Sequence, residues 1–512
     1  MTFLQKHLKE ILLAIVILAI YFLTRLIFLT NIPIFTDEAI YIRWAQISLH
    51  DASWRFISLT DGKQPFQTWV MMGFLKVISD PLIAGRLVSV TAGFFSMIGL
   101  WFLSFALFKN KTVSFLTLLL YIFYPLALLH DRLAIEDSLS AMWYIWSLYF
   151  SLLLIRRQNI AAAYTLGFVL GGGVLTKSIG LISMALLPFF LIFFDFKQKN
   201  YRYKLFKVIG LGVISVVIGF IMFGILRLSP LYGMIATKNN TFVFPLHDWL
   251  QQTIAFRYSL FSGNLIRLLS FFVGYFNVTY IVFLIVGLLI GLYRKEKTIL
   301  IMYFAAPFLF DAAFGKVLFP RYILFMTDVL LPIVAYGIWQ ASMIVFQKHK
   351  KFMQSGLLIF SFIALLPTMY VSIFLLINPL KAPIPDTDHF QYIADWPAGW
   401  GITNAITYLR QNSTSSHIFV GTEGNFGLMP YGFEMYFYND KNITTKWYWP
   451  ISQTIPADLL AEAKQMPTYI YFYEPCVNCP ATGVAPVGWP VTPVLTVSVS
   501  RAHATLYKVN AQ

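Results

Sequence analysis

Long apolar segments recur along this chain and constrain its fold more than any other feature. An apolar helix of about 20 residues crosses the hydrocarbon core of a bilayer. Hydrophobic residues make up 58% of the sequence and charged residues 12%, which is typical of a multi-pass membrane protein. The sequence predicts about eleven spans, at 11–30, 82–108, 112–129, 138–155, 160–176, 179–195, 208–228, 268–293, 298–314, 321–346 and 355–378.

The positions of the charges predict which side of the membrane each loop faces. Lys and Arg cluster in alternate short loops, at 109–111, 156–157, 197–207, 294–297 and 348–351. Because cytoplasmic loops carry an excess of Lys and Arg, we expect these loops and the N-terminus to lie inside. The net charge of +15 is therefore explained by topology, and we expect a lipid bilayer around the chain but no nucleic-acid partner.

The composition changes near residue 381, and the sequence predicts no further span beyond that point. Segments typical of helices and strands alternate from there onward, which indicates a small α/β domain. We therefore predict a membrane domain at 1–378, with interfacial helices in its outer loop 31–81, and an extracytoplasmic α/β domain at 379–512. Cys476 and Cys479, the only cysteines, are expected to form a local disulfide there rather than a metal or redox site.

Charged residues that could take part in chemistry gather in the loops predicted to face outward. They are Asp37, Glu38, Lys63, Arg86, the run from His130 to Asp137, Lys177 and Arg321. Taken singly, each could be an interface anchor or half of an ion pair, and the acidic pair could simply begin a solvated helix. Taken together on one membrane face, the carboxylates can accept protons and the cations can neutralise phosphate. This combination suggests transfer chemistry on a lipid-linked phosphate.

The order of these motifs resembles the integral-membrane glycosyltransferases of the GT-C fold. The similarity is to the branch of protein O-mannosyltransferases and bacterial aminoarabinose-lipid A transferases, and it covers about residues 1–345. The matching segments are Asp37-Glu38-Ala39, Gly62-Lys63-Gln64-Pro65-Phe66, Arg86, the run from Asp131 to Asp137, Leu175-Thr176-Lys177-Ser178 and Pro320-Arg321-Tyr322. Gln64 stands where that branch commonly has a proline, which bears on the geometry of this loop.

The resemblance implies an α-helical GT-C protein that is a hexosyl- or pentosyltransferase. Its donor would be a sugar linked to a polyprenyl phosphate, and its acceptor a hydroxyl group on the outer face of the membrane. The acceptor could belong to a protein, a glycan or a lipid. Asp37 matches the position of the base, with Glu38 supporting it, and the reaction would invert the anomeric centre.

The leaving group in such a reaction is a lipid phosphate, which needs its charge neutralised. The resemblance implies that Lys177 and Arg321 bind this phosphate, with Arg132 and Arg86 as helpers. Asp137 matches an acidic position of the family and would be structural, orient the substrate or act more directly in catalysis.

Other positions have less defined roles. Lys63, Glu136 and Tyr322 would orient the substrate. A divalent cation is possible, held by Glu38 or by His247, although an interface histidine is the simpler interpretation of His247.

A transporter or flippase of lipid-linked sugars is the alternative function. Transporters keep polar groups near the bilayer midplane and show repeated halves, whereas these charges gather at one face. Asp328, which lies inside a predicted span, is the main feature that this alternative explains. It could also be an ion-pair partner or line a lipid groove.

Overall fold

The structure, a computed structural model, describes residues 3–347, 352–414 and 416–511. The chain forms two compact units, each made of several segments. The first unit contains 1–29, 55–67 and 87–385, and the second contains 30–54, 68–86 and 386–512. The loop 31–81, predicted to be the first outer loop, thus contributes to both units, and the predicted domain boundary after residue 378 stays a prediction.

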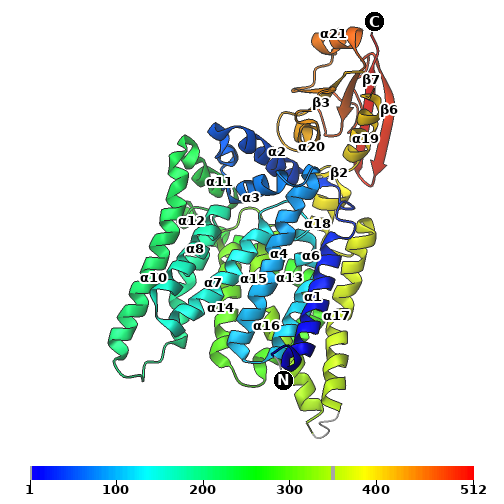
Figure 1. Ribbon diagram of the computed structural model, residues 1–512. Coiled ribbons are helices and arrows are strands. Elements are labelled where there is room, and N and C mark those ends of the chain that lie inside the picture. Colours follow the sequence, from blue (N-terminus) through cyan, green and yellow to red (C-terminus); the bar gives the residue numbers. More distant parts are fainter. Residues whose placement is uncertain (1–2, 348–351, 415, 512) are drawn as a thin grey trace. The chain divides into compact units, whose positions relative to one another are not determined.

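The first unit is a bundle of helices (Figure 1). Its helices are α1 (Phe3–Leu26), α5 (Lys111–Ile122), α6 (Pro125–His130), α7 (Asp137–Arg157), α8 (Ile160–Thr176), α9 (Gly180–Leu186), α10 (Tyr201–Gly224), α11 (Met234–Phe242), α12 (Leu246–Gln251), α13 (Ile254–Leu289), α14 (Arg294–Phe314), α15 (Leu324–Asp328), α16 (Leu331–Val345) and α17 (Met353–Ile377). Short 3-10 segments include η2 (Ile57–Asp61), η3 (Leu187–Phe193), η4 (Ile225–Leu228) and η6 (Pro320–Ile323). Helices α3 (Phe66–Leu75) and α4 (Pro81–Phe108) each begin in one unit and end in the other.

Within the described residues, seven helices are long and apolar enough to span a membrane. The number becomes eight if the pair Pro320–Asp328 and Leu331–Val345, which meet at 54°, forms one broken span. The predicted spans at 112–129, 160–176 and 179–195 coincide with shorter apolar helices. The protein is therefore multi-pass, while the predicted count of about eleven and the sidedness stay predictions. The predicted inner loop 348–351 lies outside the described residues.

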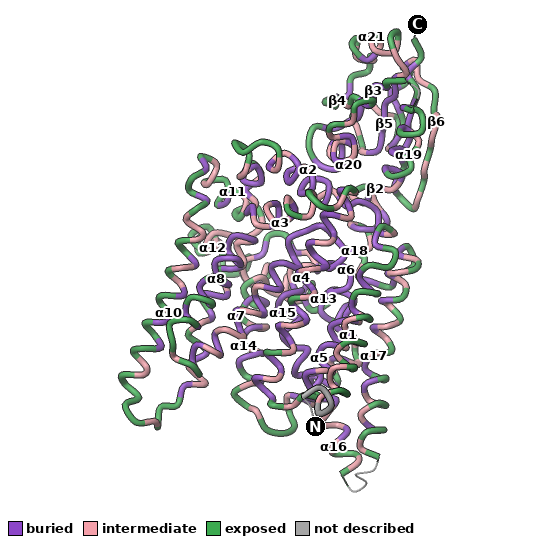
Figure 2. The backbone as a smooth tube through the Cα atoms, viewed as in Figure 1, coloured by how far each residue is buried: buried purple, intermediate pink, exposed green. Residues whose placement is uncertain are grey.

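Burial separates the core of the bundle from helices that present apolar surface (Figure 2). The most apolar stretch of α7 is 72% buried, whereas that of α10 is only 22% buried. Exposed side chains on α10 include Phe220 and Ile221. Apolar side chains in such numbers are stable on an outer surface only when lipid covers them.

The second unit contains a five-stranded sheet with the order β4-β3-β5-β7-β6. Its strands are β3 (Ile418–Glu423), β4 (Ile443–Tyr448), β5 (Thr468–Phe472), β6 (Val491–Val499) and β7 (Ala502–Val509), and its helices include α19 (Ile402–Asn412), α20 (Leu428–Phe437) and α21 (Ala457–Gln465). Strand β3 pairs in parallel with β4 and β5, and β7 is antiparallel to β5 and β6. The predicted α/β domain is present. Sequence analysis missed β6, an edge strand that contains Pro493 and a register shift beside it.

Part of the first outer loop belongs to this α/β unit. Strand β1 (Ile34–Phe35) pairs with β2 (Ala398–Gly399), and α2 (Thr36–His50) packs against α20. Arg43 Nε lies 2.8 Å from Glu434 Oε2, and the Gln46 amide donates a hydrogen bond of 2.7 Å to the Met435 carbonyl. A loop far away in sequence is therefore part of the same folded unit as the C-terminal sheet.

A buried charge network joins the end of α1 to the loop after α6. Arg25 Nη2 lies 3.2 Å from Asp131 Oδ2, with side chains 0% and 1% exposed. The hydroxyls of Tyr121 and Ser138 also donate to Asp131. Gly93 of α4 passes so close that a Cβ there would collide with the Asp131 carboxylate. Charges removed from water in this way are stable only when they are paired.

We predict that Arg25→Met destabilises the protein by about 3–5 kcal/mol, because it leaves the Asp131 carboxylate buried without its ion-pair partner. Adding Asp131→Leu should recover part of that loss. Unfolding in mixed detergent micelles measures the difference, with the exposed Arg294→Met as the matched control. An Arg25→Met protein as stable as the wild type would contradict this account.

Candidate functional site

Asp37 lies in the first turn of α2 and is partly exposed. The residue before it is anchored, because the Thr36 backbone N–H donates to the Pro397 carbonyl at 3.0 Å. The positive end of the helix dipole favours an ionised carboxylate in this position. Asp37 is thus a charged group on a firmly held helix start.

Glu38 and Arg86 form a bidentate ion pair, and both side chains are 0% exposed. Arg86 Nε donates to Glu38 Oε1 and Nη2 donates to Oε2, each at 2.8 Å. Glu38 Oε2 also accepts the Phe35 backbone N–H at 2.9 Å, while Arg86 donates to the carbonyls of Ile32 and Pro33. This geometry favours a positioning role for both residues, rather than the phosphate contact predicted for Arg86.

Lys177 follows the last residue of α8 and contacts the start of α7. Its ammonium group lies 2.9 Å from Asp137 Oδ1 and 3.2 Å from Glu136 Oε1. Burial disfavours the charged form, but the Asp137 and Glu136 carboxylates outweigh this effect and hold the pKa of Lys177 above its usual value. Lys177 is therefore cationic at neutral pH, and its side chain remains 22% exposed.

Arg321 lies close to the same group of residues. The Lys177 ammonium lies 5.4 Å from the centre of the Tyr322 ring, and the Arg321 guanidinium lies 5.9 Å from it. Both cations also interact electrostatically with Asp137. The structure thus brings together Lys177, Arg321, Tyr322, Glu136 and Asp137, and we call these five residues the cation cluster.

His130 does not add a positive charge to the cation cluster. Its side chain is completely buried, and its Nδ1 lies 2.9 Å from the Leu126 carbonyl. Burial lowers the pKa of His130 to about 4, although Asp137 opposes the shift. The imidazole is neutral at pH 7, so the positive charges here come from Lys177 and Arg321.

Gln64 connects the first outer loop to the cation cluster. Its amide donates a hydrogen bond of 2.7 Å to the hydroxyl of Ser178, the residue that follows Lys177. Lys63 lies 3.9 Å from Asp61, whose other oxygen is 2.7 Å from Lys238 of α11. A proline at position 64 could not make the bond to Ser178, so the departure from the family pattern adds a specific contact.

Arg132 stabilises the end of α1. Its Nη1 donates to the carbonyls of Thr24, Arg25 and Ile27 at 2.8–3.0 Å, and its Nη2 donates to the Phe28 carbonyl at 2.6 Å. A cation is stabilised in this position because the C-terminal end of a helix carries partial negative charge. These contacts favour a structural role over the predicted help in binding phosphate.

Sequence analysis missed several residues near these groups. Asp311 of α14 interacts electrostatically with Lys177, and Lys238 pairs with Asp61. Asp311 could have been found, because it stands near the end of the span 298–314 that is predicted to face outward, like the other residues singled out. Lys238 carried no comparable signal, since its partner is distant in sequence. Arg25 could also have been found, because it is a charged residue inside the predicted span 11–30.

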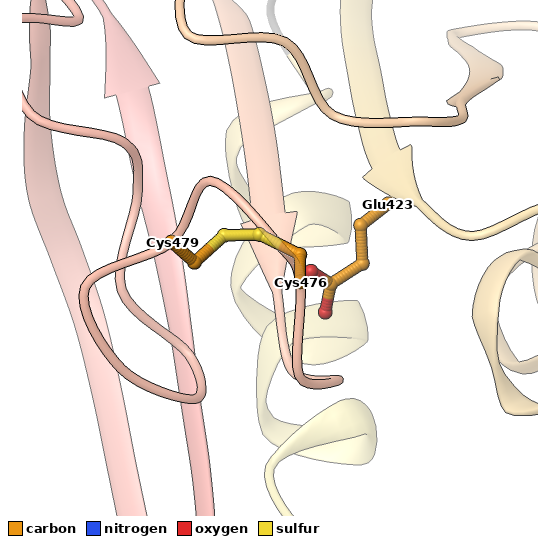
Figure 3. A group of neighbouring side chains, drawn as sticks. All are labelled: Glu423, Cys476 and Cys479. Atoms are coloured by element: carbon orange, nitrogen blue, oxygen red, sulfur yellow. A yellow bond between two sulfur atoms is a disulfide. The ribbon is translucent and has the colours of Figure 1, made fainter.

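Metal-ligating side chains give little support for a resident ion. Glu38 is paired with Arg86, and His247 is exposed, 3.4 Å from Asp248. Among the described residues, the one group of three potential ligands is Glu423, Cys476 and Cys479, with ligand atoms within 4.8 Å of one another (Figure 3). The cysteines form the predicted disulfide, whereas a metal ligand is the thiolate form. A divalent cation stays a prediction.

Glu423 lies beside this disulfide at the end of β3 (Figure 3). Its carboxyl group accepts the backbone N–H groups of Tyr473 and Glu474. Burial raises the pKa of Glu423 to about 8. The carboxyl group is therefore largely protonated at neutral pH, which makes it a weaker metal ligand.

Comparison with known proteins identifies the fold. A family model described as dolichyl-phosphate-mannose-protein mannosyltransferase matches residues 62–223. The crystal structure of ArnT from Cupriavidus metallidurans in the apo state has a TM-score of 0.58 at 14% identity, covering 97% of each chain. The structure of the same protein bound to undecaprenyl phosphate gives 0.56 at 12% identity, covering 98% of each chain. No curated protein sequence matches the chain. The prediction of a polytopic helical GT-C fold with a C-terminal α/β domain is confirmed.

Proposed function

We propose that this protein is a membrane glycosyltransferase, which moves a sugar from a polyprenyl-phosphate donor to an acceptor hydroxyl on the outer face of the membrane. The observation that carries the proposal is the cation cluster, in which Lys177 and Arg321 lie against one ring, Tyr322. The matched family model is described as a dolichyl-phosphate-mannose-protein mannosyltransferase, and ArnT binds undecaprenyl phosphate. Both support a donor of this class.

The charge balance of the cation cluster suggests how it would receive the donor phosphate. Glu136 and Asp137 already neutralise Lys177. A phosphate binding there would take over the Lys177 and Arg321 charges, while the carboxylates keep the lysine in place before the donor arrives. In a site of low dielectric, such paired charges stabilise the developing negative charge as the sugar leaves.

Asp37 is the residue that we propose as the base. A single displacement at the anomeric carbon forms the bond to the acceptor oxygen, breaks the bond to the phosphate and inverts the configuration. The acceptor hydroxyl loses its proton to Asp37, and the phosphate departs with the electron pair. Because a phosphate is stable as an anion, its departure requires no proton.

Replacing Asp37 with Asn should reduce transfer by about two to four orders of magnitude, because the amide cannot accept the acceptor proton. The assay uses purified protein, a polyprenyl-phosphate sugar and a mixture of protein, glycan and lipid acceptors. Asp51→Asn, an exposed carboxylate just after the end of the same helix, is the matched control. Full turnover by Asp37→Asn, with intact folding, would remove Asp37 from the catalytic role.

Glutamine at Lys177 or Arg321 should weaken binding of undecaprenyl phosphate strongly. The loss of one charged hydrogen-bonding partner typically costs about 2–5 kcal/mol, because the phosphate is left under-neutralised. Binding of the radiolabelled lipid to detergent-solubilised protein measures the effect. Arg227→Gln serves as control, since Arg227 is an exposed cation in η4. Equal binding by all three variants would show that Lys177 and Arg321 are interface anchors.

A transporter of lipid-linked sugars remains the second candidate because of Asp328. Both carboxylate oxygens of Asp328 are buried without a hydrogen-bond partner, and the adjoining helices meet at 54°. Buried ionisable residues beside broken helices are typical of transporters. The two functions differ in their products: a transferase releases polyprenyl phosphate, whereas a transporter leaves the sugar–phosphate bond intact.

The proposed sidedness predicts how single cysteines will react. Both natural cysteines form a disulfide, so a new thiol should dominate labelling by a membrane-impermeant maleimide. In intact cells we expect Gln453→Cys in the α/β unit to be labelled and Lys199→Cys to be protected until the membrane is opened. Labelling of both from the same side would contradict the topology and the outer-face site.

A further inference from the structure

An open cavity of about 540 Å³ lies beside strand β4 in the α/β unit. Strand β4 stands at one edge of the described sheet, beside β3. Its lining includes Lys446, Trp447, Tyr448, Trp449, Pro450 and Asp458. This volume lies within the range of about 300–1,000 Å³ found for ligand sites. The cavity belongs to none of the groups described so far.

Two tryptophans give this cavity an unusual surface. Trp447 is 48% exposed and Trp449 is 46% exposed, although both are large apolar side chains. Trp447 precedes the buried Tyr448, the last residue of β4, and Trp449 follows it directly after the strand. Exposed aromatic side chains that line a cavity typically mark a binding surface.

Charged groups line the same cavity. Asp458 of α21 accepts hydrogen bonds from the Lys446 ammonium at 2.6 Å and from the Tyr448 hydroxyl at 3.1 Å. The Asp458 and Lys446 side chains are 45% and 54% exposed, so a ligand can reach both. The cavity therefore combines aromatic faces with a carboxylate and an ammonium group.

We propose that this cavity binds carbohydrate, namely a glycan segment of the acceptor. A sugar ring has an apolar face of C–H bonds and a rim of hydroxyl groups. The negative face of an indole attracts C–H bonds polarised by neighbouring oxygens. Hydroxyl groups can donate to the Asp458 carboxylate and accept from the Lys446 ammonium. The proposal rests on the proposed function, because it identifies the acceptor of that reaction as a glycan.

The position of the cavity suits an acceptor site. Strand β4 packs against α20, and α20 packs against α2, the helix that begins with Asp37. All three elements belong to the same compact unit. A glycan bound at β4 would therefore be retained by the folded unit that also carries the proposed base.

Two other occupants fit the cavity less well. Tryptophans can anchor a domain in a membrane interface, but anionic membranes favour clusters of cations rather than an exposed acid. An extended peptide could add to the free edge of β4, but Pro450 lacks the N–H needed to continue such pairing. Sugar recognition uses the aromatic and the charged groups together.

Binding of soluble oligosaccharides to the full-length protein in nanodiscs tests the proposal. The probes are fluorescently labelled mannotetraose, chitotetraose and cellotetraose. We expect saturable binding of at least one probe, weakened roughly 10- to 30-fold by Trp447→Ala or by Trp449→Ala, as for truncated aromatic anchors. Trp396→Ala should bind like the wild type, because Trp396 is 42% exposed in the same unit but does not line the cavity. Unchanged thermal unfolding of the variants excludes misfolding.

Two results would overturn the proposal. One is the absence of saturable binding of every probe by the wild type, or equal binding by the Trp447 and Trp449 variants. The other is quenching of these two tryptophans by brominated phospholipid in the nanodisc, which would identify a membrane anchor. Binding of undecaprenyl phosphate to the same wild-type sample separates the proposals. If the wild type binds a glycan but not undecaprenyl phosphate, the proposed donor alone is refuted. If it binds undecaprenyl phosphate but no glycan, this inference alone is refuted.

Discussion

The bidentate ion pair between Glu38 and Arg86 determines how the first outer loop is arranged. Both side chains are removed from solvent, and Arg86 also gathers the carbonyls of Ile32 and Pro33 around the pair. Removing one partner of such a pair typically costs about 3–5 kcal/mol, so the loop has little freedom to open. Asp37 precedes Glu38 directly, and its partly exposed carboxylate is presented by a backbone that its neighbour holds in place.

The cations of this protein fall into two groups that differ in burial. Arg25, Arg86 and Arg132 are 0% exposed, and their guanidinium groups bind carboxylates and backbone carbonyls. Lys177 and Arg321 are partly exposed and contact the Tyr322 ring. A buried cation bound to protein groups stabilises a helix end or a loop, whereas a partly exposed cation can exchange a protein carboxylate for a ligand phosphate. Exposure thus separates positioning residues from candidate ligand-binding residues.

The C-terminal α/β region is structurally integrated with the first outer loop. Strand β1 pairs with β2, and the Arg43–Glu434 ion pair fastens α2 to α20. The folded unit that carries Asp37 is therefore completed by residues more than 350 positions away in sequence. Such long-range pairing gives the α/β region a direct mechanical connection to the residue proposed as the base.

The sequence alone determined the features that depend on local patterns. Apolar length predicted helices at every proposed span, because a helix satisfies its own backbone hydrogen bonds in lipid. The order of the Asp37, Lys177 and Arg321 motifs indicated the GT-C fold, and the alternation after residue 381 indicated an α/β domain. Edge strand β6, with its proline and irregular burial, lacked such a pattern.

Tertiary structure decided which charged residues pair with one another. Arg86, Arg132 and Lys177 are all basic residues near the end of a helix, and nothing local distinguishes them. Arg86 pairs with Glu38, which is 48 positions away in sequence. Arg132 binds the Phe28 carbonyl just after α1, which is 104 positions away. A charge takes part in structure or in binding according to its partners and its burial. Both depend on long-range packing, which a local sequence pattern does not encode.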